Sequence, residues 1–245
     1  MKVLRSIIIA TLIGAGLAPL CGCQAKPQYG VEAELYLPAT KRQIWAVAPA
    51  LNLSGQKEVD PLLQADVLYS QLQQVHGLTV VPVNRVVEVF AGLHLEKVQT
   101  PEQASLVCDL LGCDALVVPT VTAFDPYSPP KLGASLQVFR KPRGYARPDN
   151  VDPRELARQA SLVPGKSLPA PANQFLQSVG MFDAANGSVR ESLETYARGR
   201  NDPVGPLGVK EYYVSMDRYC GFVYNSLIGD VLRQIREQTL KLKAA

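Results

Sequence analysis

The sequence predicts an α/β fold of the α+β kind, in which helices pack on a mixed sheet in two or three layers. Apolar runs of strand length recur along the chain, at Ile44–Ala48, Leu78–Val83 and Asp114–Phe124. Segments with apolar residues at helical spacing separate these runs, and such alternation is typical of sheets that carry helices on their faces. A long amphipathic segment, Lys210–Lys243, predicts a C-terminal helix that docks on the sheet through its apolar stripe.

Two helix starts carry the same signature, at Asp60–Pro61 and Thr100–Pro101. In each pair the first side chain can accept hydrogen bonds from the opening amides of a helix, and the proline suits the first helical position. The first of these helices is predicted to end at Gly77. The second carries Gln103 at the third position of a capping box and is predicted to end at Gly112.

The strand predicted at Asp114–Phe124 changes character along its length. Its first half is continuously apolar, as expected of a strand covered on both faces, and its second half alternates apolar and polar residues. Pro119 stands between the halves and predicts a bulge or a change of neighbouring strand. Upstream, Asn84 is predicted to cap a helix that follows the strand Leu78–Val83.

The C-terminal half of the chain continues with strand patterns. Leu132–Phe139 is predicted to pair back on the preceding strand, and Gln174–Ala184 is predicted to be a further strand. Ala185–Ser188 predicts a hairpin turn, because Asn-Gly adopts positive φ angles at little cost. The proline-rich, basic stretch at 140–172 cannot build a packed core, so it predicts an insertion in a single domain over 43–245.

The N-terminal segment has the pattern of an export signal. Lys2 and Arg5 precede the apolar run Ile7–Leu20, which is shorter than the roughly 20 residues of a membrane span. Residues 1–22 are therefore interpreted as a signal peptide. The sequence Leu20-Cys21-Gly22-Cys23 resembles the bacterial lipobox, which implies cleavage before Cys23 and attachment of lipid to its sulfur and new amino terminus. Residues 23–42 would then tether the domain to the lipid.

A lipidated Cys23 predicts a protein anchored in the cell membrane or the outer membrane, with its domain facing the periplasm. Gln24 follows that cysteine, where lipoproteins kept at the inner membrane commonly carry aspartate, so the outer membrane is favoured. The alternative is an ordinary signal peptide that is cut slightly later and leaves a free secreted protein.

The composition narrows the classes of partner and site. The chain has 245 residues, of which 47% are hydrophobic, with 25 Lys and Arg against 22 Asp and Glu. This even charge balance predicts no nucleic-acid partner. Because there are only 2 histidines and no paired cysteine motifs at zinc spacing, no metal site and no cofactor are predicted.

Three cysteines remain in the predicted domain: Cys108, Cys113 and Cys220. Export permits disulfides, and a bridge between Cys108 and Cys113 would leave Cys220 unpaired. The alternative is that all three are small buried side chains. The sequence leaves both open.

Four segments carry a resemblance to a known family: Ile44–Gly55 (IWAVAPALNLSG), Leu78–Val89 (LTVVPVNRVVEV), Leu111–Val121 (LGCDALVVPTV) and, more weakly, Phe182–Gly187 (FDAANG). They resemble envelope lipoproteins related to the curli-secretion subunit CsgG. The same module occurs in lipoprotein activators of penicillin-binding proteins and in the N-terminal domain of TolB-like proteins. The resemblance implies the fold and not the task. Pro119 replaces a family glycine, and no strands of a secretion pore are evident.

No catalytic motif is present in the sequence: it has no Gly-x-Ser-x-Gly elbow, phosphate-binding glycine loop or His-Glu-x-x-His. We therefore expect no enzyme, but a lipid-anchored adaptor or assembly accessory that contacts another envelope protein; homo-oligomerisation stays open. The alternative is a module that binds a small molecule or glycan through Asn52, Ser54 and Asp60, which crowd one loop after the first strand. A hydrolase built on His76 or His94 is the third hypothesis.

Overall fold

The computed structural model describes residues 34–39, 41–141, 175–202 and 205–244. Helices and strands alternate in the first part of this range, and a hairpin, a strand and helices make up the rest. In chain order the elements are β1 (Leu35–Tyr36), β2 (Gln43–Val47), β3 (Leu51–Asn52), α2 (Pro61–Gln73), β4 (Val75–His76), β5 (Leu78–Val81), α3 (Val83–Leu93), α4 (Pro101–Leu111), β6 (Ala115–Asp125), β7 (Lys131–Arg140), β8 (Phe175–Asp183), α6 (Gly187–Ala197), η1 (Gly208–Lys210), α7 (Glu211–Val214) and α8 (Met216–Ala244).

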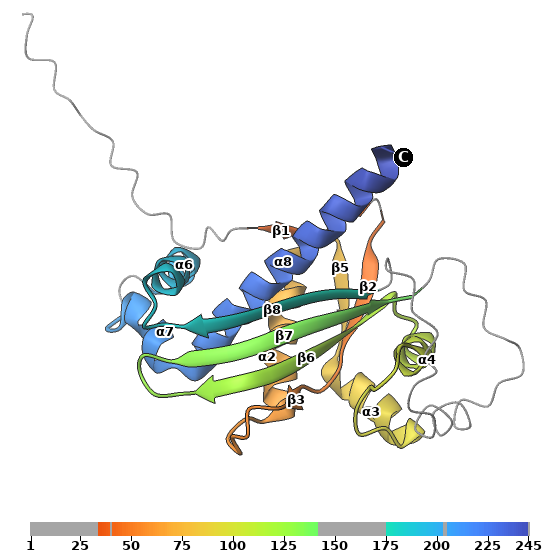
Figure 1. Cartoon of the computed structure of the whole chain (residues 1–245), viewed down its shortest axis with the longest axis horizontal. Helices are drawn as coiled ribbons and strands as arrows, with labels where there is room; N and C mark the ends of the chain where they lie inside the picture. The colour runs from red at the N-terminus through yellow and green to blue at the C-terminus, as the bar shows by residue number, and fades with distance from the viewer. Residues whose placement is uncertain (1–33, 40, 142–174, 203–204, 245) are drawn as a thin grey trace, which may run out of the picture.

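The main sheet is mixed, as predicted. Its strands lie in the order β5-β2-β6-β7-β8, and β3 pairs with the far part of β6. The pairs among β5, β2 and β6 are parallel, whereas β6, β7 and β8 are antiparallel neighbours (Figure 1). Trp45 lies opposite Ala115 and Val47 opposite Val117, so two of the apolar runs do lie side by side. The short strands β1 and β4 form a separate parallel pair.

Helices cover both faces of the parallel part of the sheet, which gives three layers there. Trp45 and Val47 point into a cluster with α2 and α8, while Ala46 and Ala48 point into a second cluster with α3 and α4. Successive side chains of a strand point to opposite faces, so the continuous apolar run of β2 feeds both clusters. The helix α8 crosses the sheet obliquely behind β7 and β8 (Figure 1).

The two predicted helix starts are confirmed. The Asp60 carboxylate accepts from the amides of Leu62 (2.8 Å) and Leu63 (3.3 Å), and the Thr100 hydroxyl accepts from the amide of Gln103 (3.3 Å). The Gln103 side chain returns to the amide of Gln99, one residue before the cap, at 2.8 Å. α4 ends at Gly112 in the left-handed conformation, as predicted.

The predicted change of neighbour at Pro119 is also confirmed. β2 pairs with β6 only as far as Val117, and β3 joins the same side of β6 from Thr120. Pro119 lies in the gap between β2 and β3. Because no strand pairs with β6 on that side at this position, the proline can lack an N–H without loss of a hydrogen bond in the sheet. The register shift in this strand lies further on, between Val121 and Ala123.

Two predicted helix boundaries are wrong. α2 ends at Gln73 and not at Gly77, because Val75–His76 is extended and pairs with Leu35–Tyr36, about forty positions earlier in the chain. β1 therefore belongs to the folded body although it falls in the predicted tether, 23–42. Asn84 does not cap α3: that helix begins at Val83, and Asn84 lies in its first turn.

The hairpin turn predicted at Ala185–Ser188 is wrong as well. Asn186 is the N-cap of α6, and its side-chain oxygen accepts from the amide (3.0 Å) and the hydroxyl (2.8 Å) of Ser188. Gly187 is not among the positive-φ glycines. The same Asn-Gly pair that suits a tight turn also suits a helix cap, and here the cap prevails.

The predicted long C-terminal helix is confirmed over Met216–Ala244, but the predicted segment Lys210–Lys243 is interrupted. Ser215 is extended, with φ −104° and ψ 112°, and separates α7 from α8. It serves as a cap, because the Tyr219 amide donates to its carbonyl at 3.0 Å and the Arg218 amide reaches its hydroxyl at 3.5 Å.

Several predictions fall on other parts of the chain. The signal peptide, Cys23, Gln24 and nearly all of the insertion at 140–172 lie outside the described residues. Within the residues that the structure does describe, no helix combines the length and the apolar composition needed to cross a bilayer.

Candidate interaction surface

Of the three residues predicted to bind a ligand, Asn52 and Ser54 contact each other, and the side chains of all three form hydrogen bonds with backbone groups. The Asn52 amide nitrogen donates to the Gln56 carbonyl (2.7 Å), and its oxygen accepts from the Ser54 amide (3.1 Å) and hydroxyl (2.7 Å). The Ser54 hydroxyl in turn accepts from the Gln56 amide at 3.2 Å. Asp60 caps α2. Their polar atoms are therefore engaged in a turn and a cap, which is what such side chains commonly do after a strand.

The two histidines lie apart. His76 on β4 is exposed and stacks on Tyr36, with ring centroids 4.7 Å apart, while its Nε2 lies 3.8 Å from the Glu34 carboxylate. His94 is exposed and follows α3 in the left-handed conformation. Among the described residues, no group of three or more His, Cys, Asp and Glu side chains is arranged to hold a metal ion.

The most unusual surface of the described chain is the outer edge of β8. This strand is the last in the sheet order and is paired only with β7. The Ala184 amide donates to Pro130 across that pair, whereas the Gln177 carbonyl accepts from Gln234 on the other side. Backbone directions alternate along an antiparallel strand, so the N–H and C=O of Gln177, Val179 and Met181 point away from the sheet.

We call Val179–Asp183 the open edge. In the part of the chain that the structure describes, no hydrogen bond reaches the outward backbone groups of Val179 or Met181. Their side chains point to the sheet face opposite α8 and are 65% and 59% exposed. Unpaired strand backbone and apolar side chains thus stand together on one strand. An edge of this kind is a template for pairing with another chain.

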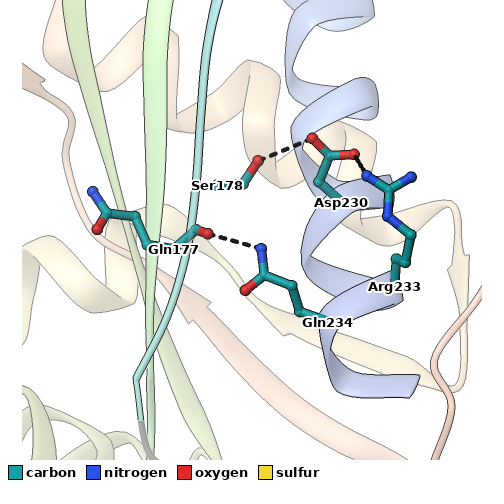
Figure 2. Close-up of polar contacts among 5 residues, drawn as sticks. All are labelled: Gln177, Ser178, Asp230, Arg233 and Gln234. Carbon is teal, nitrogen blue, oxygen red and sulfur yellow. Dashed lines mark hydrogen bonds and ion pairs between the residues drawn. The ribbon is translucent and has the colours of Figure 1, made fainter. Parts of the chain in front are cut away.

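Figure 2 shows what closes the other half of β8. Gln234 on α8 donates from its Nε2 to the Gln177 carbonyl at 2.8 Å. One turn earlier, Asp230 accepts from the Ser178 hydroxyl at 3.4 Å and pairs with Arg233 at 2.5 Å. Gln234 thus occupies the outward carbonyl of Gln177, while Asp230 holds the Ser178 side chain on the face that carries α8, so the open edge begins at Val179.

Between Phe175 and Phe182 the composition of β8 does nothing to discourage pairing. From Phe175 to Phe182 the strand (FLQSVGMF) has no charge and no proline, the two devices that usually protect an edge. Gly180 interrupts it, and the Phe182 ring lies over that glycine in the space that a Cβ would fill. An aromatic ring placed over a strand glycine restores the packing that the glycine gives up.

An ion pair marks the end of the open edge. Lys131 Nζ lies 2.8 Å from the Asp183 carboxylate, its partner across the β7–β8 register. The hydrogen bond from Lys131, followed by one from the Ala185 amide, lowers the pKa of Asp183, and the same pair raises the pKa of Lys131. Both groups face solvent, so the pair fixes the strand end in place more than it stabilises the fold.

Comparisons with known proteins give distant likenesses. No protein-family model matches the chain, and no curated protein matches its sequence. Among solved structures it is similar to lipoprotein GNA1162 from Neisseria meningitidis, with 16% identity and a TM-score of 0.40 over 66% of this chain and 99% of that one. It is also similar to the LpoB C-terminal domain from Salmonella enterica, with 13% identity and a TM-score of 0.35 over 42% of this chain and 75% of that one. A third likeness is to the hypothetical protein CT253 from Chlamydia trachomatis, with 11% identity and a TM-score of 0.33 over 81% of this chain and 95% of that one. These likenesses are too distant to bear on function.

Sequence reasoning missed the open edge for an identifiable reason. The strand itself was predicted, but so was a hairpin turn after it, and a hairpin would have supplied a further strand. Because Asn186 starts α6 instead, the chain leaves the sheet and β8 stays at its margin. The lack of charge between Phe175 and Phe182 was the available signal.

Proposed function

We propose that this chain is a lipid-anchored protein of the bacterial envelope that binds a partner protein through the open edge of β8. The observation that carries the proposal concerns Val179 and Met181. Their outward backbone groups form no hydrogen bond among the described residues, and their side chains are exposed. The partner would add an extended segment to the sheet. In this mode of recognition the main chain supplies affinity and alternate side chains supply specificity.

The chemistry of the edge describes the segment that would fit. Val179 and Met181 are apolar and lie on the same face, so the partner segment should present apolar side chains at alternate positions toward that face. Lys131 and Asp183 lie at the end of the edge and offer one charge of each sign. A partner of this kind is an envelope protein with an uncharged strand-forming stretch.

The lipid anchor is the second part of the proposal, and it rests on the Leu20–Cys23 motif. Eleven residues lie between Cys23 and Leu35, the first strand residue of the body. Covalent geometry limits that span to at most about 40 Å. The domain would therefore stay close to one membrane surface, where an accessible strand edge meets other proteins of the same compartment. Gln24 favours the outer membrane for this role.

We further propose that the chain acts without catalysis, as an adaptor or assembly accessory. Its two histidines are exposed and lie on separate elements. The side chains of Asn52, Ser54 and Asp60 form hydrogen bonds with backbone groups of their own turn and helix cap. These placements support a binding role. They do not favour the small-molecule or glycan alternative.

Capture of the full-length protein from detergent-solubilised membranes tests the proposal. Val179→Lys places a charge on the open edge, and because the native side chain is largely solvated the fold should tolerate it. Val214→Lys is the matched control, since Val214 is 58% exposed and lies on α7, outside β8. The proposal predicts at least about a tenfold loss of the captured partner with Val179→Lys, equivalent to about 1.4 kcal/mol of binding, and no loss with Val214→Lys.

The outcomes separate the candidate occupants. Equal capture by both variants would show that any partner binds elsewhere, and would sink the proposal. If Val179→Lys abolishes only self-association, measured by light scattering of the purified protein, a second copy of the chain occupies the edge and the partner claim is wrong.

A further inference from the structure

The turn between α4 and β6 brings two cysteines together. Gly112 adopts a left-handed conformation, with φ 66°, directly after the last helical residue. The Cys113 amide then donates to the Cys108 carbonyl at 2.9 Å. A left-handed glycine with this six-residue backbone bond is the Schellman motif, which packs the side chains at the two ends of the bond against each other. Usually both are apolar, whereas here both are thiols.

The side chains confirm the contact that the backbone dictates. The thiols of Cys108 and Cys113 hydrogen-bond to each other, and the two residues are only 1% and 3% exposed. That hydrogen bond, followed by burial, raises the pKa of Cys108 far above its ordinary value. The pair is therefore a protonated dithiol when reduced, and only the small fraction that loses a proton can exchange. A disulfide requires Cα atoms roughly 4.4–6.8 Å apart, a separation suited to residues whose backbones share a hydrogen bond.

A pocket lies against Cys108, one member of this pair. It has a volume of about 160 Å³ and lies between α4 and the adjacent ends of β7 and β8. Cys108 forms part of its wall, with Ala104, Phe139 and Lys141 among its neighbours. Lys141 forms an ion pair with Asp109, beside Cys108; the Asp109 charge raises the pKa of Cys108 and Lys141 offsets part of that effect.

We propose that Cys108 and Cys113 form a disulfide by exchange with an external disulfide oxidant. One thiol loses its proton and attacks a sulfur of the oxidant, which breaks the oxidant's S–S bond and releases one thiol. The second cysteine then loses its proton and attacks the mixed disulfide, which releases the other thiol. Two cysteine thiols and one disulfide thus become one protein disulfide and two small thiols, and the protein is oxidised by two electrons. The proposal requires no particular compartment.

The test uses oxidised glutathione and the full-length protein. Tryptic cleavage after Lys97 and Lys131 places both cysteines in one peptide, Val98–Lys131, while Cys220 falls in Tyr219–Arg233. The purified protein is reduced, treated with oxidised glutathione, unfolded, alkylated and digested. We expect the Val98–Lys131 peptide to be two hydrogen atoms lighter than the reduced peptide, and to carry no alkyl label until it is reduced. The disulfide in it should form faster at higher pH, because the attacking species is a thiolate.

Cys220 is the internal control. It is fully buried, and its thiol accepts from Gln64 at 3.6 Å, with no contact to another cysteine among the described residues. We expect its peptide to carry one alkyl label in every sample. Cys113→Ser should replace the internal bridge by a glutathione adduct or by an alkylated Cys108. Double labelling of Val98–Lys131 after prolonged treatment, or glutathione on both of its cysteines, would overturn the proposal.

Discussion

At the scale of single residues, the register of β8 decides which backbone groups are available. Ser178 and Val179 are neighbours, yet the N–H of Ser178 points to β7 and the N–H of Val179 points outward. Proline removes one N–H donor and is tolerated in a strand only where that donor faces solvent. The two positions therefore form a matched pair for testing the edge.

Val179→Pro should change the free energy of unfolding by less than about 1 kcal/mol, because no internal hydrogen bond is lost. Ser178→Pro should lower it by at least about 2 kcal/mol, because the β7 carbonyl opposite is left unsatisfied in a buried ladder. Urea unfolding of both variants measures the difference. Equal losses would mean that the outward direction assigned to Val179 is wrong.

The Lys131–Asp183 pair makes a prediction about pH. The folded pKa of Asp183 is lowered, so the pair contributes stability above the ordinary carboxyl pKa of about 3.9 and loses it as the pH falls through the folded value. Lys131→Met should raise the pKa of Asp183 toward that ordinary value in an NMR titration. Lys97→Met, between α3 and α4, is the control and should leave it unchanged; a shift of equal size there would contradict the assignment.

At the scale of elements, the contact between α2 and α8 contains polar groups in an otherwise apolar layer. The Tyr224 hydroxyl on α8 donates to Gln64 on α2 at 2.8 Å, and the Asn225 amide nitrogen on α8 donates to Gln71 on α2 at 3.4 Å. Burial raises the pKa of Tyr224 well above its usual range, so it stays a neutral donor. Gly221 on α8 allows the close approach, since a Cβ there would lie 3.3 Å from the Gln71 amide nitrogen.

Two buried tyrosines of α8 should respond oppositely to loss of their hydroxyls. Tyr224→Phe leaves the Gln64 oxygen unsatisfied and should lower the free energy of unfolding by about 1–3 kcal/mol. The Tyr219 hydroxyl is buried with no hydrogen-bond partner among the described residues, so Tyr219→Phe should be neutral or stabilising by up to about 1 kcal/mol. Calorimetric unfolding of the two variants tests this, and a larger loss with Tyr219→Phe would contradict the packing.

Elements with local signals were predictable, and elements defined by distant partners were not. The caps at Asp60 and Thr100 and the exchange of neighbours at Pro119 follow from short-range chemistry. The strand at Val75–His76 depends on a partner about forty positions away, which periodicity cannot show. Asn186 was ambiguous for another reason, because the same side chain suits a tight turn and a helix cap. That ambiguity concealed the open edge.

At the scale of the whole molecule, the proposed lipid anchor and the proposed binding edge would have to act in the same compartment. Cys23→Ser removes the sulfur that would carry lipid, while the described body, which begins at Glu34, is unchanged. We expect the protein to move from the membrane fraction to the soluble periplasmic fraction, because a polypeptide without acyl chains loses the affinity that they provide. Val214→Lys should stay in the membrane. Retention of Cys23→Ser in membranes would show that lipid at Cys23 is not the anchor.

Site-specific photo-crosslinking in intact cells tests the central claim most directly. A photoreactive amino acid is placed at Met181 on the open edge and, in a second strain, at Val214 on α7, two positions of similar exposure. We expect irradiation to join Met181, and not Val214, to one other envelope protein, and Val179→Lys to abolish the adduct. No adduct at Met181, equal adducts at both positions, or an adduct made only of two copies of this chain would contradict it.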